Sequence, residues 1–172
     1  MGIIARQSIK GTIATYFGVA IGFVTTFFIL TKYLTPEEVG LTRVLVDAAT
    51  LFSSLALMGT GSSTLRFYPH FKDESRNQQG LYFWTLIIPF VGFLIFLICF
   101  FAFKGWIINT FEDKSPLFVN YVYFTLPMAF SILYMAVFET NATILERVAV
   151  PRMIREVFIR LGLLIGYLLY GL

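Results

Sequence analysis

Three ionisable side chains in apolar surroundings are the residues of this sequence best suited to chemistry: Arg43, Asp47 and Glu139. Arg43 and Asp47 have the i, i+4 spacing, so on a helix they share one face and can touch. A guanidinium group can bind phosphate through two parallel hydrogen bonds, and a neighbouring carboxylate can orient it or exchange a proton. The pair is therefore either a self-neutralising unit that lets its helix enter a membrane or a site for an anionic substrate.

Glu139 lies at the end of the apolar stretch that begins near Pro116. Two interpretations stay open for this carboxylate. It is a hydrated residue at a membrane interface, or it is a gating or coupling residue that pairs with an arginine when a central cavity closes. Both interpretations need a long helix that carries Glu139 to the boundary between lipid and water.

The composition predicts that these residues sit in an integral membrane protein. The chain is 58% apolar and 13% charged, whereas a soluble domain has about 25% charged residues. The net charge of +3 does not indicate nucleic-acid binding, because the basic residues fall between the apolar stretches. The single cysteine, Cys99, lies within an apolar run and is expected to be buried.

The apolar stretches predict an all-α, polytopic membrane helix bundle with five spans, at about residues 11–34, 41–65, 81–103, 117–141 and 155–172. The fifth stretch is shorter than the roughly 20 residues that a spanning helix needs. We therefore expect the chain to be an N-terminal fragment of a longer protein. The lysines and arginines place nine residues on the side of the N-terminus and four on the other, which predicts a cytoplasmic N-terminus.

Two local patterns predict how the first helices begin and pack. Thr35-Pro36-Glu37-Glu38 is typical of a helix start, with Thr35 as the N-cap, Pro36 at the first helical position and Glu38 completing a capping box. Small residues recur on one face of the first span, at Gly11, Thr15, Gly18, Gly22 and Thr25. This face is suited to close helix packing or to a smooth wall beside a substrate cavity, and Gly162-x-x-x-Gly166 repeats the packing pattern.

Several motifs resemble those of one transporter family. The stretch LTPEEVG (34–40) is similar to the turn after that family's first span, and GTG (59–61) with LRFYP (65–69) is similar to the close of its second. Val150-Pro151-Arg152 and the following Arg155-Glu156 resemble its fourth loop. On these motifs the chain resembles the polysaccharide exporter family of oligosaccharide flippases, within the multidrug/oligosaccharidyl-lipid/polysaccharide exporter superfamily.

This resemblance implies a fold, a function and a set of partners. The fold would be most of the first lobe of a two-lobe bundle around a central cavity, and the partner would be the missing C-terminal lobe of the same protein. The function would be the flipping of a lipid-linked oligosaccharide across a bacterial inner membrane for polysaccharide biosynthesis. Arg43 and Asp47 would then bind the substrate, in contact with membrane lipid, and Glu139 would serve in gating or coupling.

Two other functions stay open, and one class is not expected. A multidrug or cation exporter of the same superfamily would need a more acidic cavity, and a non-transporting membrane scaffold would need no binding site. We do not expect an enzyme, a cofactor or a nucleic-acid partner, because the sequence offers no nucleophile–base set, no metal-ligand cluster and no phosphate-binding loop.

Overall fold

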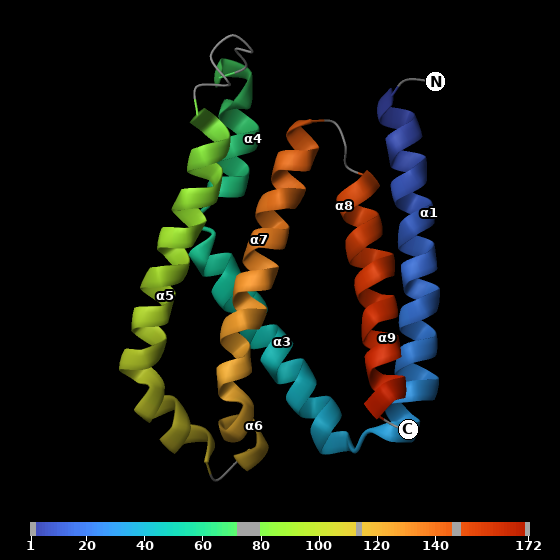
Figure 1. Ribbon diagram of the computed structural model, residues 1–172, viewed down its shortest axis with the longest axis vertical. Coiled ribbons are helices and arrows are strands. Elements are labelled where there is room, and N and C mark those ends of the chain that lie inside the picture. Colours follow the sequence, from blue (N-terminus) through green and yellow to red (C-terminus); the bar gives the residue numbers. More distant parts are fainter. Residues whose placement is uncertain (1–2, 72–79, 113–114, 146–148, 171–172) are drawn as a thin grey trace. The chain divides into compact units, whose positions relative to one another are not determined.

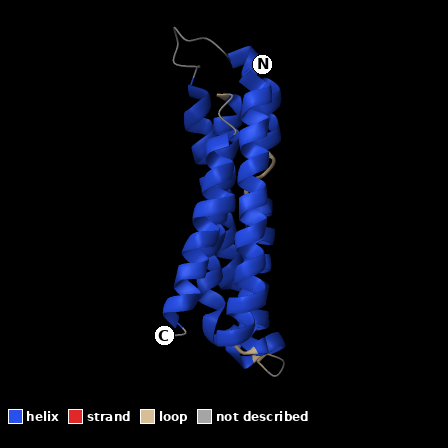
Figure 2. Cartoon of the chain, turned by 90° about the vertical axis from the view of Figure 1, so that its right-hand side faces the viewer, coloured by secondary structure: helices blue, strands red, loops and turns tan. Residues whose placement is uncertain are grey.

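The computed structural model describes residues 3–71, 80–112, 115–145 and 149–170, and nearly all of these residues are helical, with no strand among them (Figures 1 and 2). The prediction of an all-α fold is confirmed. The chain divides into two compact units, one formed by residues 1–40 with 141–172 and the other by residues 41–140. Each unit is described in turn.

Among the described residues, four helical stretches are long and apolar enough to cross a membrane: Ile9–Tyr33, Pro36–His70, Leu81–Phe111 and Pro116–Ile144. They are consistent with a multi-pass membrane protein. Many of their large apolar side chains are exposed, among them Phe17, Leu55 and Ile98, as lipid-facing positions require. Cys99 is also exposed on this surface, so the expectation that it is buried is wrong.

A fifth helical stretch, residues 149–170, is not one of these candidate spans. It carries Arg155, Glu156 and Arg160, which is more charge than an ordinary spanning helix tolerates. The described helix starts at Ala149, so Val150, Pro151 and Arg152, which resemble part of a loop between spans, are helical. Whether this stretch is a fifth membrane span stays a prediction.

The unit that contains both ends of the chain pairs the first and last helices. Helix α1 (Ile3–Val24) continues as a π-helical segment, η1 (Thr25–Leu30), and a last turn, α2 (Thr31–Tyr33). Beside it lies one continuous rod made of α8 (Ala149–Met153), the π-helical η4 (Ile154–Phe158) and α9 (Ile159–Tyr170), which runs in the same direction (Figure 1). The small-residue face of α1 meets this rod.

The predicted turn after the first span is confirmed in detail. The backbone N–H of Thr35 donates to Glu38 Oε2 at 2.8 Å, and the backbone N–H of Glu38 donates to Thr35 Oγ1 at 3.4 Å. This reciprocal pair is the capping box, and α3 (Pro36–Ala56) starts at the proline as expected. Two backbone donors at the helix start are therefore satisfied by neighbouring side chains.

The second apolar stretch is not one helix. Helix α3 ends at Ala56 and α4 (Thr60–Phe71) follows after a three-residue turn. Met58 and Gly59 both have positive φ, at 50° and 72°, and Met58 N–H donates to the Leu55 carbonyl while Thr60 N–H donates to that of Leu57. The left-handed backbone breaks the i to i−4 ladder, which a continuous span over residues 41–65 would keep.

The remaining helices begin as predicted, but one ends later. Helix α5 (Leu81–Phe111) passes the predicted end at residue 103, so it is about 46 Å long against a hydrocarbon core of about 30 Å. Lys104 does not stop it, because lysine is a favourable residue in a helix interior; its ammonium group lies 5.0 Å from the centre of the Tyr123 ring. After Ser115 the chain forms α6 (Pro116–Tyr121), a 3₁₀ turn η3 (Val122–Phe124) and α7 (Thr125–Ile144).

The core of residues 41–140 lies where α3, α5 and α7 meet. One cluster joins Ala49 and Ala56 of α3 to Phe93 of α5 and to Ala129 and Leu133 of α7. A second cluster joins α3 and α5 to α6 and η3, through Leu45, Phe100, Phe118 and Val122. Small side chains at the crossing let the helix backbones approach closely, as membrane helices commonly do.

Candidate functional site

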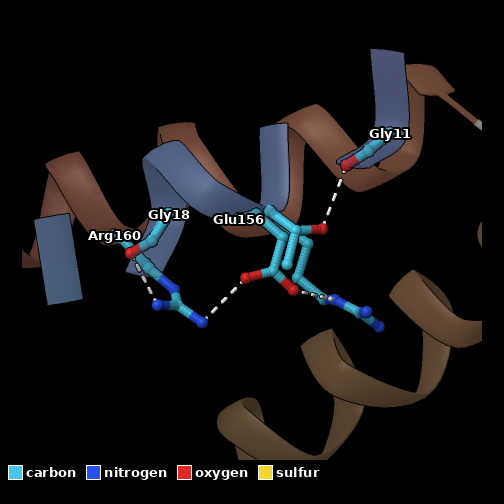
Figure 3. Close-up of polar contacts among 6 residues, drawn as sticks. Gly11, Gly18, Glu156 and Arg160 are labelled. Atoms are coloured by element: carbon cyan, nitrogen blue, oxygen red, sulfur yellow. Dashed lines mark hydrogen bonds and ion pairs between the residues drawn. The ribbon is translucent and has the colours of Figure 1, made fainter. Parts of the chain in front are cut away.

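A network of charged side chains links the last helical rod to the backbone of α1 (Figure 3). Arg160 Nη2 lies 2.7 Å from Glu156 Oε2, and Arg155 Nε lies 3.4 Å from Glu156 Oε1. The second terminal nitrogen of Arg160, Nη1, donates to the carbonyl oxygen of Gly18 at 2.6 Å. One carboxylate therefore lies between two guanidinium groups, and one of these groups is bonded to the neighbouring helix.

Glycine on α1 makes this arrangement possible. A Cβ atom at Gly18 would stand 2.5 Å from the Glu156 carbonyl oxygen and 2.9 Å from its Cβ, and a Cβ at Gly22 would stand 2.7 Å from Arg160 Nη1. A larger residue at Gly18 would push the two helices apart, because the obstacle is backbone, whereas one at Gly22 would displace the Arg160 guanidinium group. The small-residue face is thus a packing face, as its spacing predicts, and what it packs against is charged.

The backbone of the last rod is irregular where it carries these charges. Arg155 and Glu156 belong to η4, where the helix widens to the π form. Such widened turns are uncommon and are found frequently at functional sites. The first helix has a π-helical segment of its own, η1, one turn beyond Gly22. Irregular hydrogen bonding therefore occurs in both helices of this unit.

The network lies beside the middle of a candidate membrane span. Gly18 is near the middle of the candidate span Ile9–Tyr33. The Glu156 side chain is 14% exposed, against 36% for Arg160 and 48% for Arg155. An ionised side chain at such depth costs a few kcal/mol to insert and usually pairs with another charge or faces a cavity. Here Glu156 and Arg160 pair at i, i+4, which offsets part of that cost.

The two residues predicted to form the binding pair are placed close to each other but not in contact. Arg43 and Asp47 lie one turn apart on α3, and both are exposed. No ion pair joins them among the residues that the structure describes, although their spacing allows one. Glu139 lies half-buried on α7. All three belong to residues 41–140, and their proposed roles stay predictions.

Glu156 and Arg160 were missed as site residues because their charges resemble those of a loop between spans. Two signals in the sequence point to them nonetheless. They have the i, i+4 spacing of a helical ion pair, and Gly162-x-x-x-Gly166 just after them is typical of a membrane helix. Neither signal identifies Gly18 as the residue that accepts the arginine.

Neither metal binding nor comparison with known proteins assigns a role to this site. Within the described part of the chain, no three His, Cys, Asp or Glu side chains gather closely enough to hold a metal ion. No family model, no curated protein and no solved structure matches this chain.

Proposed function

We propose that the chain belongs to a membrane transporter that moves a lipid-linked oligosaccharide from the inner to the outer leaflet during polysaccharide biosynthesis. The observation that carries the transport part is the Glu156–Arg160 pair, bonded to the backbone of the first candidate span. Ionisable residues at membrane depth typically mark pathways for ions or substrates. A helix bundle with no transport role would gain little from keeping three charges there.

The net positive charge of the last rod supports an anionic substrate. The last rod carries Arg152, Arg155 and Arg160 against Glu156 as its acidic residue in the described range. A positively charged surface attracts phosphate groups and repels cations. This balance favours a lipid diphosphate over the organic cations that a multidrug exporter carries.

Three residues of the second unit complete the proposal. Arg43 is exposed on α3, where its planar guanidinium group would bind a phosphate through two hydrogen bonds. Asp47, one turn further along the helix, would orient Arg43 or exchange a proton as the cavity alternates. Glu139 on α7 would act in gating or coupling.

The choice of a lipid-linked oligosaccharide rests on the sequence motifs. The LTPEEVG turn and the GTG and LRFYP segments resemble those of oligosaccharide flippases. The capping box formed by Thr35 and Glu38 explains why the LTPEEVG turn contains these two residues. It fixes the start of the helix that carries Arg43.

A flipping assay tests the proposal. The full-length gene product is reconstituted into liposomes that contain a fluorescent undecaprenyl-diphosphate oligosaccharide, and dithionite quenches the label exposed on the outside. We expect the quenched fraction to rise only when the protein is present, and not for phosphatidylcholine carrying the same label.

Two variants separate substrate binding from general charge loss. Arg43→Gln should slow flipping, whereas Arg66→Gln, which removes a second exposed arginine of the same unit, should leave it unchanged. Efflux of ethidium without movement of the labelled oligosaccharide would replace this proposal with cation export. Absence of movement of either compound would contradict transport.

A further inference from the structure

Two exposed basic residues, Lys10 of α1 and Arg152 of α8, belong to the region where these two helices contact each other. Helices α1 and α8 run side by side in the same direction (Figure 1), and Arg152 of α8 lies against Gly11 of α1. A Cβ at Gly11 would stand 3.1 Å from Arg152 Nη1 and 3.3 Å from its Cδ, so the glycine leaves room for the arginine. Lys10, the residue before Gly11, is also exposed.

Both cations belong to one end of the first candidate span: Lys10 is the second residue of Ile9–Tyr33, and Arg152 contacts the third. If this span crosses a membrane, we expect both cations at the level of the lipid headgroups. The residues around them are apolar and exposed, with Ile9 at 48%, Ile13 at 51% and Val150 at 58%. Apolar side chains beside a positively charged pair are suited to an acyl chain and a phosphate group of the same molecule.

The charge of Arg152 is available for such a ligand. No acidic side chain pairs with it within the described residues, because the nearest carboxylate along its helix, Glu156, is bonded to Arg155 and Arg160. A guanidinium group presents several N–H donors in one plane and can hold a phosphate through two of them. Lys10, which precedes the glycine that Arg152 contacts, supplies a second positive charge on the neighbouring helix.

We propose that Lys10 and Arg152 bind the phosphate group of an anionic membrane lipid. The site requires only that the helices lie in a membrane, so it does not rest on the transport function. A phosphate of this kind has two sources, a phospholipid of the bilayer or a lipid diphosphate that the protein carries. Both present the same chemistry to the two side chains.

Native mass spectrometry of the detergent-purified full-length protein tests this proposal. The probes are short-chain phosphatidylglycerol and short-chain phosphatidylcholine, and the measured quantity is the ratio of their binding constants. We expect Lys10→Gln and Arg152→Gln each to lower this ratio about fivefold, the typical effect of one cation near a membrane surface. Arg152→Lys keeps the charge and should retain most of the preference.

The matched control is Lys32→Gln, which removes the same charge at the other end of the same span, where the ammonium group lies 5.2 Å from the Tyr33 ring centre. It should leave the ratio unchanged. An equal loss in Lys32→Gln, or no loss in Lys10→Gln and Arg152→Gln, would overturn the site. Lys10→Gln alters an exposed side chain, so it keeps the test decisive if Arg152→Gln fails to fold.

Competition with farnesyl diphosphate identifies the source of the phosphate. If farnesyl diphosphate displaces phosphatidylglycerol at a concentration below that of the phosphatidylglycerol, the result would support the site and assign it to lipid diphosphates. Binding of phosphatidylglycerol without displacement would support the site and assign it to bilayer phospholipid. Weak, equal binding of all three lipids would overturn it.

Discussion

Replacement of Gly18 by alanine tests whether the first and last helices depend on their close approach. The new methyl group would stand 2.5 Å from the Glu156 carbonyl oxygen, where ordinary contact begins at 3.4 Å. The obstacle is backbone, so no change of rotamer relieves it, and overpacking of this kind costs about 1–3 kcal/mol. Separation of the helices would also weaken the 2.6 Å hydrogen bond from Arg160 to Gly18, worth about 1 kcal/mol. Alanine has a higher helix propensity than glycine, which stabilises the folded state by about 1 kcal/mol and offsets part of this loss.

We therefore expect Gly18→Ala to lower the free energy of unfolding by about 1–3 kcal/mol. The assay is equilibrium unfolding of the full-length protein in mixed detergent and SDS micelles, followed by far-UV circular dichroism. The control is Gly162→Ala in α9, where no atom lies within 4 Å of the position that a Cβ would take. This variant should be neutral or gain up to about 1 kcal/mol. Equal stability of Gly18→Ala and Gly162→Ala would refute the reasoning.

Two further predictions use the same unfolding measurement. Ser53→Ala removes a buried hydroxyl group that lies 2.8 Å from the Ala129 carbonyl oxygen, and it should lower the free energy of unfolding by about 0.5–1.5 kcal/mol. Ser54→Ala, on the exposed face of the same helix, should change this free energy little. Equal losses in the two variants would argue against the contact between Ser53 and Ala129. Met58→Gly relieves a positive φ of 50° and should stabilise the protein by about 1 kcal/mol; a destabilised variant would contradict the left-handed conformation of this turn.

Local patterns in the sequence are enough to predict the helix starts and the packing face of α1. Thr35, Pro36 and Glu38 form their capping box within four residues, so no distant contact is needed to identify it. The small-residue face that includes Gly18 is likewise visible from spacing alone. Its confirmed role in packing follows from the absence of side chains that would keep another helix away.

The parts that depend on distant contacts were not predictable in this way. The break after Ala56 uses a left-handed methionine, which sequence rules do not anticipate. The continuation of α5 past residue 103 is supported by contacts of Lys104 and Phe111 with rings of the following helices. The contact that Arg160 makes was not predictable, because its acceptor, the Gly18 carbonyl, is 142 residues away in the sequence. Gly162 and Gly166 match a packing motif, yet within the described chain no other segment lies within 4 Å of the position that a Cβ would take at either residue.

The most direct test of the central claim asks whether the charge network serves transport or only joins two helices. The double variant Glu156→Gln/Arg160→Met removes both charges together, and such paired replacements are often neutral for stability. Its initial flipping rate is measured in the liposome assay, at matched amounts of folded, full-length protein. We predict a rate at least about tenfold below wild type, equivalent to roughly 1.4 kcal/mol in the transport barrier. A folded double variant that flips the lipid-linked oligosaccharide at the wild-type rate would contradict the account.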